Sequence, residues 1–181
     1  MNEGIRRRGF CVWLTGLPGS GKSTTAEALV PLLEARGWVV RLLDGDSLRK
    51  SISAGLGFSK DDRDRHIRRV GRLGTEITER GEVAVVAVIS PYRSTREECR
   101  AAVGEELFIE VFVDTPLSVC EERDPKGLYA RARAEGVPNV TGFNDPYETP
   151  TQPEIRLDTV AQGADENAQR ILEILSQRGL L

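Results

Sequence analysis

The sequence predicts an α/β domain built on a mostly parallel sheet, and three observations predict it. Short apolar runs of strand length alternate with longer amphipathic stretches along the 181 residues. The run at residues 83–89 is almost unbroken in apolar residues, as expected of a strand covered on both faces. The length suits one domain, 1–181, and the 39% hydrophobic and 29% charged residues exclude a disordered chain or a membrane protein.

The individual elements follow, in chain order, from the apolar runs and the amphipathic stretches. Apolar runs indicate strands at residues 10–14, 38–43, 83–89, 107–113 and 155–158. Apolar residues at helical spacing indicate helices at residues 22–36, 47–54, 60–80, 95–103, 116–123 and 165–177. Gly37 and Gly81 follow the first and third of these helices, where glycine commonly ends a helix.

The segment between Arg123 and Pro153 departs from this alternation. It is rich in proline, glycine and basic residues and shows little apolar periodicity. Long loops in compact domains are commonly lids or binding loops. We therefore expect residues from about 124 to 150 to form a lid, an excursion that is not part of the core.

The charge balance excludes one broad class of function. Lys and Arg number 25 against 28 Asp and Glu, a net charge of −3, whereas general nucleic-acid binders carry a basic excess. No apolar stretch is long enough to cross a bilayer, and the arginines at positions 6–8 precede no apolar core of signal-peptide length. We expect a cytoplasmic protein with no nucleic-acid or membrane partner. The three cysteines lack metal-binding spacing and are expected to be reduced core thiols.

A glycine-rich stretch between the first strand and the first helix carries the strongest chemical signal. It reads Gly16-Leu17-Pro18-Gly19-Ser20-Gly21-Lys22-Ser23, with Thr24 following, and fits the phosphate-loop pattern GxxxxGK[ST]. In such a loop the backbone N–H groups point at phosphates, and the lysine reaches the β and γ phosphates of a nucleotide. We expect Lys22 to be an exposed catalytic residue, and Ser23 to hold Mg²⁺ through its hydroxyl.

Two aspartates follow the second predicted strand. Asp44 and Asp46 come at its carboxyl end, and in a parallel sheet these ends gather beside the phosphate loop. Asp46 is expected to hold an acceptor hydroxyl or take its proton, and Asp44 to reach Mg²⁺ through water. The alternative is that both aspartates only cap the helix that starts near Ser47.

Arg63 and His66 are expected on the inward face of the helix at residues 60–80. Each lies four residues before a member of the apolar stripe, Ile67 or Val70. A buried arginine and histidine need anionic or hydrogen-bonding partners, which a bound anionic substrate can supply. His66 is alternatively a structural histidine. Three further arginines of this helix are expected on its solvated face: Arg65, Arg68 and Arg72.

Ser90 directly follows the predicted strand 83–89, at the end of the sheet where ligands collect. No histidine or aspartate base lies near it in the sequence. A loop hydroxyl that hydrogen-bonds the substrate is therefore favoured over a nucleophile, although a covalent role stays open.

These motifs, with others along nearly the whole chain, resemble those of the adenylylsulfate kinases (APS kinases). The shared stretches are Thr15-Gly16-Leu17, Leu43-Asp44-Gly45-Asp46 with Leu48-Arg49, Gly57-Phe58-Ser59 with Asp62-Arg63, Ile67-Arg68-Arg69-Val70, Ile89-Ser90-Pro91-Tyr92-Arg93, residues 120–129, Thr141-Gly142 and Pro146-Tyr147-Glu148. That family transfers the γ-phosphoryl group of ATP to the 3′-hydroxyl of adenosine 5′-phosphosulfate (APS), which activates sulfate. The resemblance implies a three-layer phosphate-loop NTPase fold similar to nucleotide kinases, with ATP and Mg²⁺ as cofactors.

The resemblance also implies roles for particular residues. The APS pocket is expected to be lined by Asp46, Arg49, Phe58, Arg63, Ile89, Ser90 and Lys126, joined on the substrate side by His66, Leu128, Gly142 and Phe143. Arg123 is expected to abut the adenine of ATP. The family commonly forms homodimers, and an association with an ATP sulfurylase is left open.

Two positions depart from the family pattern. His66 stands where the family usually has asparagine, and Val140 stands where an aromatic residue usually precedes Thr-Gly. A protonated imidazole would add positive charge near APS, so we expect APS binding to strengthen as the pH falls toward 6. Two other functions stay open, namely a kinase for another small hydroxylated acceptor and a nucleotide-gated module without turnover.

Overall fold

A computed structural model describes residues 8–181 of the chain. Its centre is a five-stranded parallel sheet with the strand order β2-β3-β1-β4-β5. The strands are β1 (Cys11–Thr15), β2 (Val40–Asp44), β3 (Val83–Ala87), β4 (Phe108–Val113) and β5 (Ile155–Leu157). The predicted α/β fold with a parallel sheet is confirmed. The arginines at positions 6 and 7, considered above for a leader segment, lie outside the described residues.

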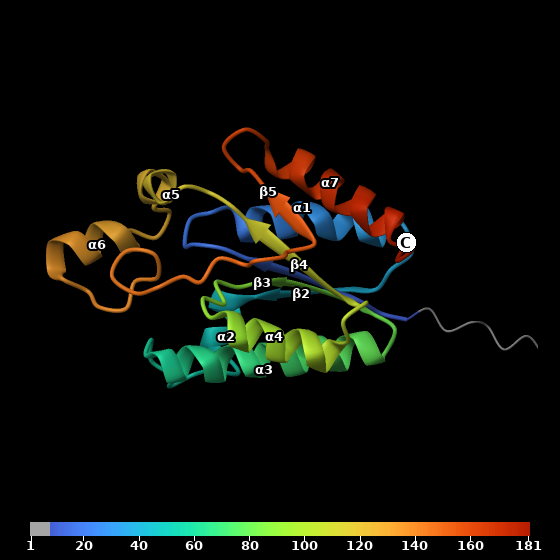
Figure 1. Cartoon of the computed structure of the whole chain (residues 1–181), viewed down its shortest axis with the longest axis horizontal. Helices are drawn as coiled ribbons and strands as arrows, with labels where there is room; N and C mark the ends of the chain where they lie inside the picture. Colours follow the sequence, from blue (N-terminus) through green and yellow to red (C-terminus); the bar gives the residue numbers. More distant parts are fainter. Residues whose placement is uncertain (1–7) are drawn as a thin grey trace, which may run out of the picture.

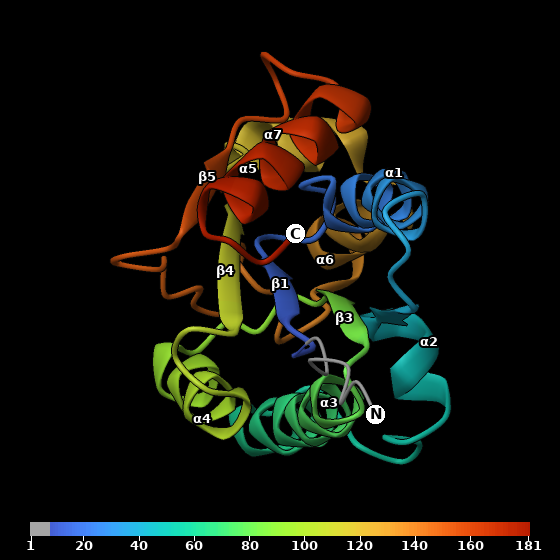
Figure 2. The same cartoon turned by 90° about the vertical axis from the view of Figure 1, so that its right-hand side faces the viewer.

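Helices cover both faces of the sheet and make three layers (Figure 1). Helices α1 (Lys22–Glu34) and α7 (Ala164–Gln177) pack together on one face, and α3 (Lys60–Glu79) and α4 (Arg93–Val103) pack together on the other (Figure 2). The short helices are α2 (Gly45–Lys50), α5 (Leu117–Arg123) and α6 (Leu128–Glu135). Helices α5 and α6 lie beyond the end of the sheet at which β1 leads into α1 (Figure 1).

Each face of the sheet has its own apolar core. Alternate residues of the central strand β1 serve the two faces, because successive side chains of a strand point to opposite sides. Val12 and Leu14 belong to the core under α1 and α7, whereas Cys11 and Trp13 belong to the core under α3 and α4. All four side chains are fully buried. The central strand is thereby held from both sides, which positions the loop that follows it.

The boundaries differ from the prediction where the chain leaves the sheet. β2 begins at Val40, and α2 begins at Gly45, because the Asp44 carboxylate caps this helix by accepting a hydrogen bond from the Ser47 N–H at 3.1 Å. β3 ends at Ala87, and the chain then turns at Ser90, where φ is 41°. Helix α6 lies within residues 124–150, where the sequence analysis expected an excursion without helical periodicity.

The cysteines are free and buried, in agreement with the expected core thiols. Burial raises the pKa of Cys11 and Cys99 far above that of an ordinary thiol, so both are protonated at neutral pH. Between residues 8 and 181, no helix is both long and apolar enough to span a membrane.

Candidate active site

The stretch Gly16–Ser23 forms a loop between β1 and α1, as predicted. Gly19 and Gly21 have φ angles of 77° and 101°, which side-chain-bearing residues rarely adopt. A Cβ on Gly19 would stand 3.0 Å from the Cys120 carbonyl oxygen, and one on Gly21 would stand 3.3 Å from the Thr159 side chain. Gly21 is also the residue before the first turn of α1. The loop therefore curls over the N-terminus of a helix, where backbone N–H groups attract anions.

Lys22 is buried, not exposed as the sequence analysis expected: only 8% of its surface is accessible. Its ammonium donates hydrogen bonds to the Gly16 carbonyl at 2.9 Å and to the Leu17 carbonyl at 2.6 Å, and lies 3.3 Å from Ser20 Oγ. Burial, with a smaller effect of nearby Lys126, lowers the pKa of Lys22 to about 7 against the opposing effects of Cys120 and Asp44. The loop thus holds an amine whose protonation a bound polyphosphate would favour.

The Ser20 carbonyl is held from two other loops, a feature that sequence reasoning missed. The hydroxyls of Thr115 and Thr159 lie 2.6 Å apart, and each lies 2.9 Å from this carbonyl oxygen. Arg123 donates to Thr159 Oγ1 at 3.0 Å and to the Thr159 carbonyl at 2.7 Å. A fixed Ser20 carbonyl fixes the peptide plane it shares with Gly21. Arg123 therefore lies at the phosphate loop, beside the loop that joins β5 to α7.

Asp44 both caps a helix and faces the phosphate loop, so capping alone does not account for its contacts. Its Oδ1 accepts from the Ser47 N–H, and its Oδ2 accepts from Ser23 Oγ at 3.0 Å. A hydroxyl and a carboxylate oxygen side by side are hard donors that suit Mg²⁺. Residues 8–181 contain no cluster of three or more His, Cys, Asp or Glu that could hold a metal. A Mg²⁺ ion at Ser23 and Asp44 would accordingly take its other ligands from phosphate and water.

Asp46 lies in the first turn of α2 and forms an ion pair with Lys126. Both side chains are more than half exposed, so the pair itself contributes little to stability. The contact nevertheless brings the 124–150 segment to the second aspartate that follows β2. The structure thus joins two site residues that are 80 positions apart in the sequence.

Phe58 presents an exposed ring close to two cationic side chains. The guanidinium carbons of Arg49 and Arg63 lie 4.7 Å and 5.6 Å from its ring centroid, and 55% of Phe58 is accessible. Arg63 is 4% accessible, as the inward position on its helix predicts. An exposed aromatic face beside two guanidinium groups suits a ligand that has both a base and an anionic group.

Arg63 also contacts the 124–150 segment. Its guanidinium donates to the Phe58 carbonyl at 3.0 Å, bonds to the Asn139 carbonyl, and lies 3.4 Å from the Asp145 carboxylate. Burial lowers the pKa of Arg63, and Asp145 opposes this effect. The guanidinium group of arginine is not deprotonated in proteins, so Arg63 is cationic. It links the aromatic cluster to residues far along the chain.

His66 is inward and 3% accessible, but its neighbours favour the structural alternative. Its Nδ1 is hydrogen-bonded to Ser53 Oγ at 2.8 Å. Burial, together with the charges of Arg49, Arg69 and Arg63, lowers the pKa of His66 to about 4. The imidazole is thus neutral between pH 6 and 8. The expectation that its protonation strengthens APS binding toward pH 6 is corrected on this physical ground.

We expect His66 to make the protein less stable in mild acid. Histidine in the unfolded chain titrates at about pH 6.5 and the folded side chain at about 4, so the unfolded state binds more protons between these values. Stability is then full above about pH 6.5 and falls as the pH drops through this window. Urea unfolding measures the effect. Between pH 7 and 5 the free energy of unfolding of the parent should fall by roughly 1 to 2 kcal/mol more than that of His66→Asn. Equal losses would contradict the buried neutral imidazole.

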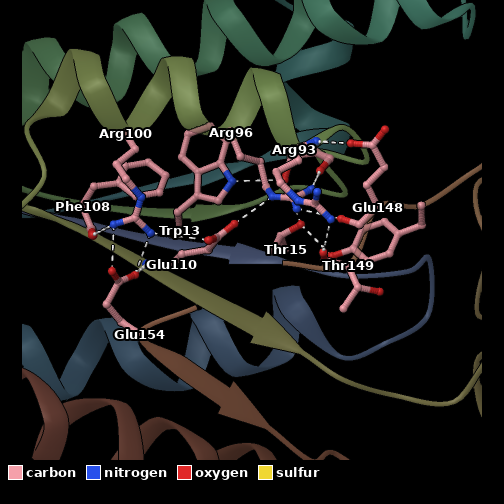
Figure 3. A network of polar contacts seen from close by, with 12 residues as sticks. Trp13, Thr15, Arg93, Arg96, Arg100, Phe108, Glu110, Glu148, Thr149 and Glu154 are labelled. Carbon is pink, nitrogen blue, oxygen red and sulfur yellow. Dashed lines mark hydrogen bonds and ion pairs between the residues drawn. The ribbon is translucent and has the colours of Figure 1, made fainter. Parts of the chain in front are cut away.

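The Ser90 hydroxyl is already paired within the protein. Trp13 Nε1 donates to it at 3.1 Å, and Ser90 Oγ donates to Thr15 Oγ1 at 2.9 Å, next to the phosphate loop. Figure 3 labels both partners, Trp13 and Thr15. Thr15 Oγ1 in turn donates to the Ile89 carbonyl at 2.7 Å. Ser90 is 1% accessible, and neither of its hydroxyl's partners is a base that could activate it. The arrangement supports a positioning role in the site, not a nucleophile.

Ser90→Ala is expected to lower kcat/KM by about 5- to 30-fold and to leave a readily measured rate. The change removes a hydrogen-bonded hydroxyl, which is worth about 1 to 2 kcal/mol, and it takes away the acceptor of Trp13 Nε1. Steady-state assays of ADP release give the value. Complete loss of turnover in a folded variant, with a labelled phosphoserine trapped in the parent, would establish the covalent alternative instead.

Three further predicted substrate residues lie on the 124–150 segment. Leu128 begins α6 and packs in a small apolar cluster with Leu17 of the phosphate loop. Gly142 adopts φ 85°, and a Cβ there would stand 2.5 Å from a Leu17 methyl carbon. Phe143 is 38% exposed, with the Arg133 guanidinium 5.6 Å from its ring. Gly142 thus adjoins the phosphate loop, Leu128 shares an apolar cluster with Leu17, and Phe143 packs with its own segment.

Arg96 is a fully buried arginine near the site that the sequence analysis did not select. It bonds to the Ser90 carbonyl at 2.7 Å from α4. A signal was available, because Arg96, Cys99 and Val103 share helical spacing and all prove buried. Like Arg63, Arg96 is a charged residue on an apolar stripe and therefore needs a buried partner.

Comparison with known proteins decides the family. The family model described as adenylylsulphate kinase matches residues 8–158. The chain belongs to the adenylylsulphate kinase family. The adenylyl-sulfate kinase of Gloeothece citriformis is 48% identical over 177 residues, which cover 98% of this chain and 99% of that protein. The family resemblance inferred from the motifs is confirmed.

Solved structures of the family share this fold. The Mycobacterium tuberculosis APS kinase in complex with AMPPNP and APS is 42% identical, with a TM-score of 0.89 over 93% of this chain and 98% of that chain. The hexameric APS kinase from Thiobacillus denitrificans is 39% identical, with a TM-score of 0.73 over 97% of this chain and 30% of that chain. As a member of this family the chain is an enzyme with a phosphate-loop NTPase fold.

Proposed function

We propose that this adenylylsulphate kinase family member transfers the γ-phosphoryl group of ATP to the 3′-hydroxyl of APS, giving 3′-phospho-APS and ADP. One observation carries the proposal: the 124–150 segment contacts both the phosphate loop and the Arg49–Phe58–Arg63 cluster. A Cβ on Gly142 would stand 2.5 Å from a Leu17 methyl carbon, and the Asp145 carboxylate lies 3.4 Å from Arg63. The segment thus connects the phosphate loop to an aromatic and cationic cluster whose chemistry suits an anionic nucleotide. The family relatives named above support the choice of APS.

On the donor side, the residues from Gly16 to Thr24 bind the phosphates of ATP. Their N–H groups and the N-terminus of α1 provide positive potential. Lys22 exchanges its contacts with loop carbonyls for the β and γ phosphates and stabilises the charge that develops during transfer. Arg123 borders the adenine side, where it contacts the loop between β5 and α7.

The oxygen donors Ser23 and Asp44 fit Mg²⁺. A bound Mg²⁺ ion supplies charge neutralisation at the β and γ phosphates. Ser23 holds its position at the first turn of α1, and Asp44 orients the Ser23 hydroxyl by accepting its hydrogen bond. The cap that Asp44 provides for α2 keeps this carboxylate in place without a substrate.

On the acceptor side, Phe58 stacks on the adenine of APS, and Arg49, Arg63 and Lys126 neutralise its phosphosulfate. Asp46 accepts the proton of the attacking 3′-hydroxyl, and the transfer is a direct in-line displacement. Ile89 and Ser90 form the wall at the end of β3. The ion pair of Asp46 with Lys126 breaks when Lys126 binds the phosphosulfate of APS. The Asp46 carboxylate is then free to contact the 3′-hydroxyl.

The 124–150 segment acts as a lid over both nucleotides. Its contacts reach the donor loop through Gly142 and Leu17 and the acceptor side through Arg63 and Asp145. Closure excludes water, which otherwise competes with the acceptor hydroxyl for the phosphoryl group. The enzyme is further proposed to be cytoplasmic and homodimeric, with a role in sulfate assimilation that is compatible with an associated ATP sulfurylase.

A coupled assay tests the proposed function. The protein is mixed with Mg-ATP and APS, and ADP and 3′-phospho-APS are quantified together. Equal amounts of the two products, with ADP release that depends on APS, are expected. Equal rates with an unrelated hydroxylated acceptor would indicate a different kinase, and nucleotide binding without transfer to any acceptor would indicate a gated module.

A further inference from the structure

Arg96 connects three separate parts of the chain from a position almost closed to solvent. It is 2% accessible and lies in α4. Its Nε donates to Glu110 Oε1 in β4, its Nη1 to the Ser90 carbonyl, and its Nη2 to the Glu148 carbonyl, each at 2.7 Å (Figure 3). All three guanidinium nitrogens are therefore engaged, and lysine cannot reproduce this planar arrangement.

The first partner, Ser90, has a backbone that needs support. Its φ of 41° lies in the left-handed region, which costs on the order of 1 kcal/mol or more for a residue other than glycine. A charged donor on the Ser90 carbonyl favours this conformation, because it holds the oxygen directed toward α4. The same turn fixes Ile89, whose carbonyl accepts from Thr15.

The second partner, Glu148, lies where the 124–150 segment returns to the sheet. Its N–H donates to the Pro91 carbonyl at 2.8 Å, and its carboxylate accepts from the Arg93 N–H at 2.7 Å. These two bonds join the loop after β3 to the end of this segment. Arg96 adds a buried charge-assisted bond to the same junction.

The third partner, Glu110, holds the guanidinium in place. Its other oxygen lies 3.4 Å from Arg100 Nη2, and Arg100 is paired with Glu154 at 2.7 and 2.8 Å. Glu154 Oε2 also accepts from the Glu110 N–H at 2.6 Å. The two acids and two arginines therefore form a closed network on the rigid sheet, and Arg96 is the member that reaches Ser90 and Glu148.

We propose that Arg96 is a positioning residue for the acceptor: it sets the loop at Ile89 and Ser90, and the return of the proposed lid at Glu148, in a fixed relation to the sheet. This inference rests on the proposed function, because the acceptor it positions is APS. The hydrogen bonds of Arg96 go to Glu110, Ser90 and Glu148, whereas the Ser20 carbonyl of the phosphate loop is held separately. Arg96 reaches Thr15, at the start of the phosphate loop, only indirectly through the turn at Ile89 and Ser90. Its loss is therefore expected to weaken binding of the acceptor much more than binding of ATP.

The test compares Arg96→Lys with Arg100→Lys. Each variant keeps a positive charge beside Glu110, and Arg100 is a matched control because its bonds go to Phe108, Glu110 and Glu154 instead of Ser90 and Glu148. KM for APS is measured at saturating ATP, KM for ATP at saturating APS, and the melting temperature of each variant is recorded. Arg96→Lys is expected to raise KM for APS about tenfold or more and to change KM for ATP less than about twofold.

Arg100→Lys should leave the KM for APS within about twofold of the parent value. This holds even if its melting temperature falls by as much as that of Arg96→Lys. Arg96→Ala is a second variant with the same expected split if it folds, but it leaves Glu110 with less compensation in the interior. Equal rises in both KM values, an unchanged KM for APS in Arg96→Lys, or the same rise in Arg100→Lys would overturn the inference. Failure of the proposed function is distinguishable, because the parent protein itself would then form no 3′-phospho-APS.

Discussion

Lys22→Ala lowers the turnover number by about 10² to 10³, because it removes a positive charge that faces the transferred phosphoryl group in a dry loop. The fold is expected to persist, since the buried ammonium bonds to its own loop and its burial is itself costly, as the lowered pKa of about 7 records. The turnover number is measured from ADP release at saturating ATP and APS. Circular dichroism and the melting temperature report the fold.

Proton uptake on ATP binding tests the charge of Lys22 separately from the shape of its side chain. At pH 7 to 8 a lysine with a pKa of about 7 is partly neutral in the free enzyme, and bound phosphates favour its protonated form. ATP binding to the parent should therefore take up protons, which calorimetry in buffers of different ionisation enthalpy detects. Lys22→Met, with a side chain of similar length, should bind ATP without this uptake. Near-normal turnover in either variant would remove Lys22 from the mechanism.

Arg63→Ala weakens APS binding by roughly a hundredfold and ATP binding by less than about twofold. The loss of one charge-assisted contact to a desolvated anion is worth about 2 to 3 kcal/mol. Arg63 is 4% accessible and also bonds to the Phe58 and Asn139 carbonyls. The variant therefore loses its contacts with Phe58 and with the proposed lid, in addition to the contact with the anionic group of APS. Equilibrium binding of each nucleotide gives the two dissociation constants.

Arg65→Ala is the matched control for this prediction. It removes the same charge from the same helix, two residues along, where the side chain is exposed and has a long ion-pair contact to Asp62 at 3.8 Å. Its APS affinity should stay within about twofold of the parent. Equal losses of APS and ATP affinity in Arg63→Ala would mean that Arg63 serves both nucleotides or the fold as a whole.

Local pattern was sufficient for much of the fold. The parallel strands, the phosphate loop and the inward position of Arg63 and His66 all follow from signals within a few residues or from periodicity along one element. Helix α6 was missed because only a short part of it is buried, at Tyr129 and Ala132, so its stripe covers too few residues to give a period. The end of β3 was placed too late because Val88 and Ile89 are apolar but leave the sheet for the loop that carries Ser90.

The residue pattern indicated a glycine-rich loop with Lys22 and acids at a strand end as the groups for the chemistry. Phe58 and Arg49 were added by the family resemblance. The protonation states and hydrogen-bond partners of these groups depend on how the chain folds. The burial of Lys22, the lowered pKa of His66 and the three bonds of Arg96 each depend on segments distant in the chain. Desolvation and hydrogen bonding depend on which groups lie close together in space. The sequence does not show those distances, because they are set only when the sheet and its helices pack.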